Sequence, residues 1–135
     1  MRLDKKVAQF VARERVCRVA TTGRAGVPHV VPVCHVFADG KVYFGSETDA
    51  RKVRNLRENP HATVEVDLYS DDWANLKGVT LQAAAAIIPS GPRFKAARKL
   101  LYAKYPQYPD ESALEERESV IVELTPRHVF TWGFE

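Results

Sequence analysis

Polar and apolar residues alternate along much of the chain, as they do in antiparallel strands with one buried face. The segment from His61 to Ser70 shows this most clearly, because Ala62, Val64 and Val66 occupy every second position. This pattern and the flanking turn residues predict further strands at Val16–Thr21, Pro28–Ala38, Lys41–Gly45, Lys77–Ile88, Ser119–Leu124 and His128–Phe134. The Asp39-Gly40 pair is a strong hairpin signal, so the strands on either side of it are expected to pair.

Apolar residues at helical spacing predict three helices between these strands. They are expected over Leu3–Arg15, from a cap at Thr48 or Asp49 to Asn59-Pro60, and from Ser90-Gly91-Pro92 to about Tyr105. The segment from Asp110 to Glu118 is predicted to be a short charged helix or a loop.

The order of these elements contains no β-α-β crossover pattern, which parallel doubly wound folds require. Six or seven strands with tight Gly and Asp turns instead predict a mainly β fold, a small antiparallel barrel with helices at its openings. With 135 residues and no internal repeat or linker, the chain is expected to form one domain over residues 1–135.

The composition is that of an ordinary soluble protein. The net charge is only +3 and most Lys and Arg residues are scattered, which argues against a nucleic-acid partner. No apolar run has the length of a membrane span, and Met1 to Lys6 leads into an amphipathic segment rather than a signal peptide. Cys17 and Cys34 are expected to be free thiols, which suits a reducing compartment. We therefore expect a cytoplasmic protein without a membrane partner.

The second helix has an unusual placement of charge. Arg51 and Lys52 lie in its first turn, where the helix dipole disfavours cations unless an anion is bound there. Val53 and Leu56 share its apolar face, while Arg51, Arg54 and Asn55 lie on the polar face. A phosphate site and a solvated basic face both explain this arrangement.

No nucleophile elbow, Walker loop or dinucleotide fingerprint is present. His29, Cys34 and His35 are close in sequence, but strand alternation separates Cys34 from the two histidines, so no metal site is expected. Asp71 and Asp72 are predicted to lie in a solvent-facing turn. No catalytic residue is assigned, and an anion site without such machinery suits a cofactor that brings its own chemistry.

Three segments resemble the pyridoxamine 5′-phosphate oxidase-like family: Pro28–Val33, Asp39–Ser46 and Arg51–Pro60. The resemblance extends from about Val16 to the C-terminus, and it implies the antiparallel Greek-key split β-barrel that binds FMN in this family. Two shorter segments, Asp67–Trp73 and Lys104–Tyr108, resemble a subgroup described as probable deazaflavin-dependent enzymes.

The resemblance also implies roles for particular residues. Lys52, helped by Arg51, corresponds to the position that holds the flavin phosphate, and Gly45 and Ser46 to the strand end that meets the ribityl chain. The residues that line the flavin ring correspond to Val30, Val31, Pro32 and Val33. Family members form homodimers with cofactors between the subunits, and Trp132 is the candidate aromatic residue that reaches the partner's flavin. A core or dimer contact is an equally good explanation of Trp132.

Two functions follow. One is a flavin- or deazaflavin-dependent oxidoreductase that transfers hydride between FMN, or the deazaflavin coenzyme F-420, and a small organic substrate. The alternative is a non-catalytic carrier of flavin or haem on the same barrel, with His29, His35, His61 or His128 as possible haem ligands. Vitamin B6 oxidation is not favoured, because Arg127-His128 is a poor match to the residues that hold pyridoxal phosphate in the oxidase itself.

Overall fold

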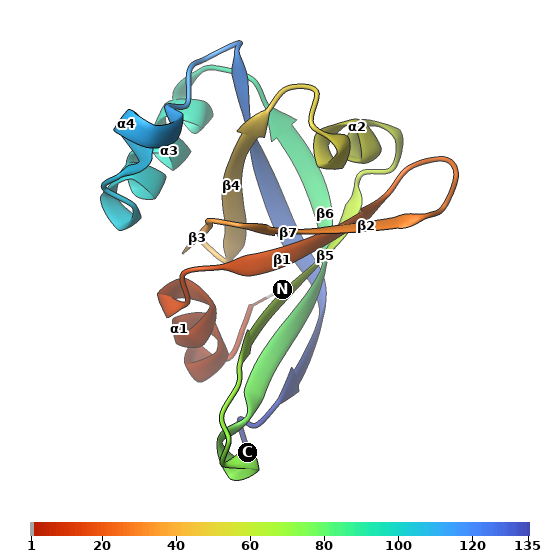
Figure 1. Cartoon of the computed structure of the whole chain (residues 1–135), viewed down its shortest axis with the longest axis vertical. Coiled ribbons are helices and arrows are strands. Elements are labelled where there is room, and N and C mark those ends of the chain that lie inside the picture. Colours follow the sequence, from red (N-terminus) through yellow and green to blue (C-terminus); the bar gives the residue numbers. More distant parts are fainter. Residues whose placement is uncertain (1) are drawn as a thin grey trace.

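A computed structural model describes residues 2–135, and Figure 1 shows the arrangement of their helices and strands. Within this range the strands are β1 (Cys17–Thr22), β2 (Pro28–Val33), β3 (Val36–Ala38), β4 (Lys41–Glu47), β5 (His61–Leu68), β6 (Lys77–Ile88) and β7 (Ser119–Trp132). The helices are α1 (Lys5–Arg13), α2 (Arg51–Glu58), α3 (Pro92–Lys104) and α4 (Tyr108–Ser112), with a 3₁₀ turn at Trp73–Asn75.

All seven strands belong to one antiparallel sheet with the order β2-β1-β5-β6-β7-β4-β3. The two edge strands, β2 and β3, are neighbours in sequence and are separated only by Cys34 and His35. This short connection spans roughly 10 Å at most, so the sheet must curl until its edges nearly meet. No ladder joins the two edges among the described residues, which leaves the barrel split. The predicted mainly β, split-barrel fold is therefore confirmed.

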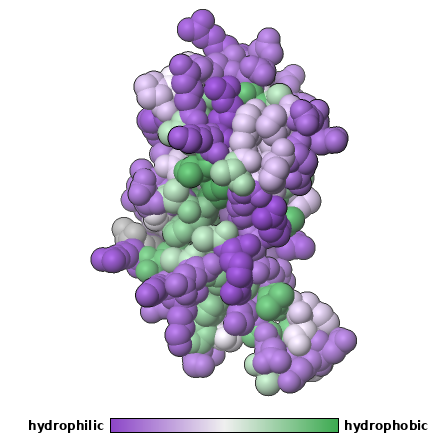
Figure 2. All heavy atoms as spheres, turned by 90° about the vertical axis from the view of Figure 1, so that its left-hand side faces the viewer, coloured by the Kyte–Doolittle hydropathy of each residue, from purple (hydrophilic) through white to green (hydrophobic). Residues whose placement is uncertain are grey.

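The core fills the inside of the curled sheet. Alternate residues of β1, β5 and β6, such as Val19, Val64 and Leu81, point inward and are fully buried. Helices α1 and α2 cover this core with Phe10 and Leu56. A second cluster lies under α3, and its large members include Phe94, Leu101, Tyr105 and Ile121. Figure 2 shows the face that carries α1, α3 and α4, where an apolar strip runs between charged side chains.

The predicted strand Pro28–Ala38 is not continuous, because the chain breaks at Cys34 and His35 to cross between the two sheet edges. His35 is fully buried there, and its Nε2 lies 2.8 Å from the carbonyl oxygen of Val11. Its backbone N–H donates to the hydroxyl of Tyr105 at 3.0 Å, and its carbonyl accepts from Lys104 Nζ at 2.8 Å. Contacts with α1 and α3 thus stabilise the break between β2 and β3. The alternation of residues along one strand does not predict these contacts.

The two strands predicted at Ser119–Leu124 and His128–Phe134 are one continuous strand, β7. Pro126 lies inside it, where it contributes no N–H to the ladder. The ladder tolerates Pro126 through a bulge, in which the register with β6 shifts between Gln82 and Ala83. The prediction of two strands is wrong here, because pairing along β6 keeps the strand whole.

Helix α2 differs from its prediction in two ways. It begins after Ala50, and neither Thr48 nor Asp49 caps it with a side chain. Asn55, assigned to the polar face, is buried and donates from Nδ2 to Thr21 Oγ1 at 3.0 Å. Val53 and Leu56 are buried as predicted. The predicted helix or loop from Asp110 to Glu118 starts earlier, as the short helix α4.

Membrane-spanning helices are absent from residues 2–135, since none of their helices combines the required length and apolar character.

Candidate functional site

A pocket of about 300 Å³ lies where the start of α2, the end of β2 and the α3–α4 corner meet. Four residues that sequence comparison assigned to cofactor binding line it: Pro32, Val33, Gly45 and Lys52. The remaining lining residues are Cys34, Tyr105, Gln107, Tyr108, Glu111 and Ser112. The fold therefore brings together residues from four separate segments of the chain, including the basic helix that the sequence singled out.

Lys52 is the cation of this pocket, and its charge is poorly compensated. Burial lowers the pKa of its ammonium, and the nearby Glu47 carboxylate only partly offsets this. Within residues 2–135, Lys52 has no ion-pair partner. A half-buried ammonium without a partner is unfavourable, and a bound anion would relieve that cost.

The start of α2 offers further donors to an anion. The N–H groups of Val53 and Arg54 both donate to the Ala50 carbonyl at 3.0 Å, and no acidic residue lies in the first turn. The amides of Arg51 and Lys52 have no partner within the part of the chain that the structure describes. Two unpaired amide N–H groups and the Lys52 ammonium are thus donors at the start of one helix, a combination that suits a phosphate group.

Tyr108 is a pocket residue that sequence analysis used only as part of a resemblance. Burial raises the pKa of its phenol to about 12, so the hydroxyl stays protonated at neutral pH. The hydroxyls of the other tyrosines, Tyr43, Tyr69, Tyr102 and Tyr105, all take part in hydrogen bonds, whereas that of Tyr108 has no such partner within residues 2–135. Tyr108 thus presents an unused donor to the pocket.

Gly45 makes this arrangement possible. A β-carbon at this position would lie 2.6 Å from Leu114 Cδ2 and 3.0 Å from the Tyr108 hydroxyl. Only glycine lets these side chains approach the β4 backbone so closely. Gly45 therefore shapes the pocket wall. Its predicted place at a strand end did not indicate this role.

The other predicted site residues lie outside this pocket. Ser46 is buried, and its Oγ donates to the Glu47 carbonyl at 3.0 Å. Arg51 is exposed, and Val31 is half-buried on β2. Val30 points to the face of β2 opposite to that of Val31, and it is 58% exposed.

Trp132 is far from Lys52 within one chain. Gly45 pairs with Ile121 on β7, whereas Trp132 pairs with Gly78 at the other end of that strand. At about 3.3 Å per residue, Ile121 and Trp132 are roughly 35 Å apart along β7. The Trp132 ring lies over Gly78, where a β-carbon would clash with it. A role at a flavin would therefore require the pocket of a second copy.

The inner wall of the pocket is fixed by a hydrogen-bond network at the end of α3. The Tyr105 hydroxyl donates to the Arg15 carbonyl at 2.7 Å and accepts from the His35 amide, while Lys104 Nζ donates to the Glu14 carbonyl at 2.7 Å. Burial, together with the neighbouring Arg15 charge, lowers the pKa of Lys104 to about 8. This network joins α1, α3 and the β2–β3 break, and so positions Cys34 and Tyr105 beside the pocket.

Both cysteines are free thiols in the structure. Cys17 is buried, which raises its pKa to about 12, whereas Cys34 is exposed at the pocket. Among residues 2–135, no three His, Cys, Asp or Glu side chains gather closely enough to hold a metal ion.

Comparison with known proteins adds to this picture. The family model for pyridoxamine 5′-phosphate oxidase matches residues 3–133. A conserved hypothetical protein from Mycobacterium tuberculosis superposes with a TM-score of 0.83 at 20% identity, over 98% of this chain and 85% of that one. The heme storage protein HutZ from Vibrio cholerae superposes with a TM-score of 0.79 at 20% identity, over 96% of this chain and 94% of its own.

An F420 reductase superposes with a TM-score of 0.72 at 19% identity, over 95% of this chain and 98% of that one. No curated protein matches the sequence. At these identities the solved structures show a shared fold, and it is the split barrel described above. Since the family model covers nearly the whole chain, the protein belongs to the pyridoxamine 5′-phosphate oxidase-like family.

Proposed function

We propose that this protein is an FMN- or deazaflavin-dependent oxidoreductase that binds its cofactor in the Lys52 pocket. The observation that carries the proposal is the half-buried Lys52 ammonium, which has no ion-pair partner within residues 2–135 and stands at an uncapped helix start. Phosphate is the group that this combination of ammonium and amide donors suits best.

The other pocket residues fit the remainder of a flavin. Pro32 and Val33 supply apolar surface for a ring, and Gly45 keeps the β4 backbone accessible. When bound, such a cofactor supplies hydride transfer from its own ring, so the protein needs no acid–base pair of its own. Tyr108 holds a proton at its hydroxyl and is suited to donate a hydrogen bond to a carbonyl or nitro oxygen of a small substrate.

Charge in and around the pocket favours FMN over the deazaflavin coenzyme F-420, whose acidic tail needs further cations. Two of the cations that could hold this tail are already engaged: Arg57 donates to the Thr48 carbonyl at 2.7 Å, and Lys95 on α3 lies 3.7 Å from the Glu116 carboxylate. Arg54 is exposed and is available. The fold likeness to an F420 reductase supports the alternative cofactor.

Titration of both cofactors at low and high ionic strength separates these two possibilities. We expect FMN to bind at both salt concentrations, because one phosphate at a partly buried site is weakly screened. A deazaflavin held by its tail should lose affinity steeply with salt. Tighter binding of F-420 than of FMN at physiological salt would reverse the cofactor assignment.

The phosphate site itself is tested by Lys52→Ala. Loss of one charge-assisted hydrogen bond should weaken FMN binding about ten- to hundredfold in a fluorescence titration. Arg57→Ala, more than a helical turn away, and Lys99→Ala, an exposed lysine on α3, are the matched controls and should bind normally. Equal affinities for Lys52→Ala and Lys99→Ala would refute the assignment. FMN should also slow the reaction of Cys34 with a thiol reagent, since Cys34 lines the same pocket.

The second candidate function is a flavin or haem carrier without turnover, and the fold likeness to the heme storage protein HutZ supports it. His35 is a poor haem ligand, because it is fully buried and its Nε2 is engaged by Val11. His61 and His128 are exposed and remain available. The absorption spectrum of the purified protein distinguishes the candidates, because flavin, deazaflavin and haem have different bands. A haem spectrum would displace the oxidoreductase proposal.

A second copy of the chain completes this proposal. Val30, Phe130 and Trp132 are 58%, 56% and 40% exposed. The register of the sheet places them on its outer face, with Phe130 opposite Thr80 and Val30 opposite Ala20. Such exposed apolar surface on one face suits a homodimer, in which Trp132 of each copy lies toward the pocket of the other.

A further inference from the structure

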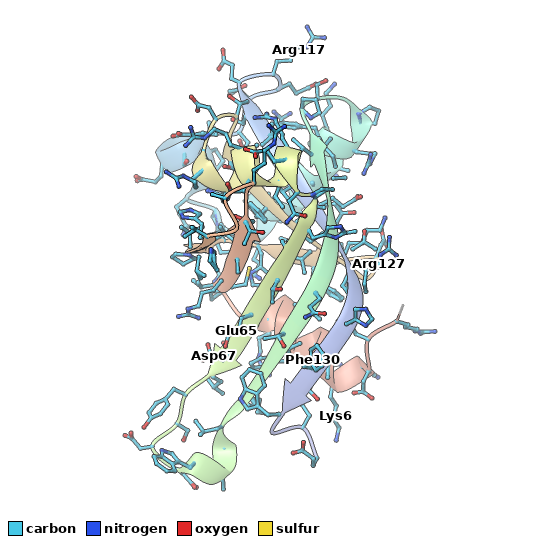
Figure 3. The ribbon with its side chains drawn as sticks, turned by 90° about the vertical axis from the view of Figure 1, so that its right-hand side faces the viewer. Lys6, Glu65, Asp67, Arg117, Arg127 and Phe130 are labelled. Carbon is cyan, nitrogen blue, oxygen red and sulfur yellow. The ribbon has the colours of Figure 1, made fainter. Side chains whose placement is uncertain are left out.

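Residues 68–76 connect β5 to β6 and project beyond the end of the sheet (Figure 3). We call this segment the aromatic arm, because it carries Tyr69 and Trp73. At the base of the arm, Gly78 pairs with Trp132. The arm therefore begins beside Trp132, at the end of β7 that is distant from the Lys52 pocket of the same chain.

Hydrogen bonds within the aromatic arm fix its shape. The Asp72 carboxylate accepts from the Ala74 amide at 3.1 Å and from Asn75 Nδ2 at 3.3 Å, and so caps the 3₁₀ turn. The Asp72 amide donates to Ser70 Oγ at 3.2 Å. Because these polar groups bond to one another, the arm is preorganised and can contact a second molecule without a further cost of ordering.

The fold of one chain leaves the aromatic side chains of the arm uncovered. Trp73 is 73% exposed and Tyr69 is 67% exposed. Trp73 Nε1 donates to the Tyr69 hydroxyl at 3.5 Å, and neither residue belongs to a core cluster. Tyr and Trp are enriched where proteins meet, because they bring a large apolar area with a polar end. The two side chains are therefore suited to contact with a second molecule.

The charge of the aromatic arm is opposite to that at the Lys52 pocket. Residues 68–76 contain two aspartates and no Lys, Arg or His. At the start of α2, Arg51, Lys52 and Arg54 form no ion pair with any residue between 2 and 135. These three cations outnumber Glu111, the acidic residue of the pocket lining. Opposite charges on two surfaces favour their association over that of other pairs of surfaces.

A two-fold dimer through the open face of the sheet would bring the arm and the pocket together. The proposed homodimer places Trp132 of each copy toward the pocket of the other, and the arm begins beside Trp132. Because a two-fold contact is reciprocal, each arm then lies against the pocket of its partner. The pocket of one chain, about 300 Å³, is at the lower end of the range for ligand sites, so a further wall would enclose a flavin better.

We propose that the aromatic arm of each copy forms a wall of the Lys52 pocket in the other copy, with Trp73 facing the bound ligand. The inference rests on the proposed function and its homodimer, and it names the element that completes the site. In this arrangement the arm brings aromatic surface to a pocket whose apolar lining includes Pro32 and Val33. The two aspartates of the arm then approach the unpaired Arg51 and Arg54. The arm therefore limits the size of the substrate that reaches the flavin ring.

The contact is tested without cofactor, through Cys34, an exposed thiol that lines the pocket. Asp71→Cys is made in the full chain, since Asp71 is exposed and forms no ion pair within residues 2–135. A short bismaleimide, which joins two thiols, should then give a covalent dimer on a denaturing gel. The same variant with Cys34→Ser should remain at the mass of one chain. Lys99→Cys, on the exposed side of α3 and with Cys34 intact, should also remain there.

The contact of Trp73 with the ligand is tested by FMN titration. Trp73→Ala should weaken FMN binding about two- to tenfold, because it removes an aromatic contact. Leu100→Ala, which removes an exposed apolar side chain from α3, should bind like the wild type.

The two experiments separate this proposal from that of the flavin pocket. A covalent dimer that depends on Cys34 but binds no FMN would support the arm contact and refute the proposed function. No covalent dimer from Asp71→Cys, or one that persists without Cys34, would overturn the arm proposal. Equal FMN affinity for Trp73→Ala and the wild type would also overturn it.

Discussion

His35 shows how much one residue contributes to this fold. It lies at the break between β2 and β3, where its side chain and both backbone polar groups contact α1 or α3. Burial, reinforced by the nearby Lys104 charge, lowers the pKa of its imidazole to about 4, although the hydrogen bond to Val11 favours the charged form. Its Nδ1 is buried without a partner in the described chain. The native state therefore holds this residue neutral.

A histidine whose pKa is lower in the folded state binds its proton more readily in the unfolded state. We therefore predict that stability is fullest above pH 6.5 and falls toward pH 4, by about 2 kcal/mol at pH 5 from this residue. Urea unfolding at a series of pH values measures this effect.

The control is His35→Gln, which is expected to be less stable at pH 7.5 but to lose less on acidification. The same pH dependence in both proteins would show that other groups cause the acid sensitivity.

At the scale of elements, the pocket depends on the fit between β4 and the segment after α3. Gly45 on β4 faces the side chains of Tyr108 and Leu114, which follow Tyr105 in the chain. Leu114 is buried, and its backbone N–H donates to the hydroxyl of Tyr102 at 2.9 Å. The position of α4, and with it one pocket wall, is therefore set by side-chain contacts rather than by strand pairing.

We predict that Gly45→Ala destabilises the protein by about 1–3 kcal/mol, because the added methyl overpacks a close contact. Leu114→Ala alone should cost about 2–5 kcal/mol, since it opens a cavity in the same place. The double variant should lose less than the sum of the two, since each change relieves the other.

Chemical denaturation of the three variants and the wild type completes this cycle. Additive losses of unfolding free energy would mean that the packing of Gly45 is independent of Leu114. Other contacts would then position the pocket wall.

At the scale of the whole molecule, the curled sheet leaves one long face uncovered. Helices α1, α3 and α4 lie on the left side of Figure 1 and α2 lies at the upper right, whereas no helix covers the outer faces of β2, β1, β5, β6 and β7 among the described residues. Val30 and Phe130 lie on that open face, and Trp132 lies at its end. The exposed Trp73, beyond β5, extends the aromatic surface toward the same end of the molecule.

We predict a homodimer through this face, and sedimentation velocity measures it. Val30→Lys and Phe130→Lys should shift the protein toward the monomer, because each places a charge in an apolar contact. Leu100→Lys, an exposed apolar residue on α3, should remain dimeric. A wild-type monomer with its cofactor fully bound would contradict the prediction.

The sequence by itself predicted the features that depend on neighbouring residues. Alternation in His61–Leu68, the Asp39-Gly40 hairpin and the helical spacing around Val53 and Leu56 all reflect backbone geometry over a few residues. The same local signals, with a family resemblance, were enough to predict a split barrel and to single out Lys52.

Only the tertiary structure decided the features that depend on distant segments. The β2–β3 break follows from the closing of the sheet and from contacts with Val11 and Tyr105. The bulge at Pro126, with which β7 remains one strand, follows from pairing with β6. The place of Tyr108 in the pocket, and the distance of Trp132 from it, follow from packing between segments far apart in sequence. Periodicity records which face of an element is buried, but not which other element covers it, and for that physical reason these features could not be read from the chain alone.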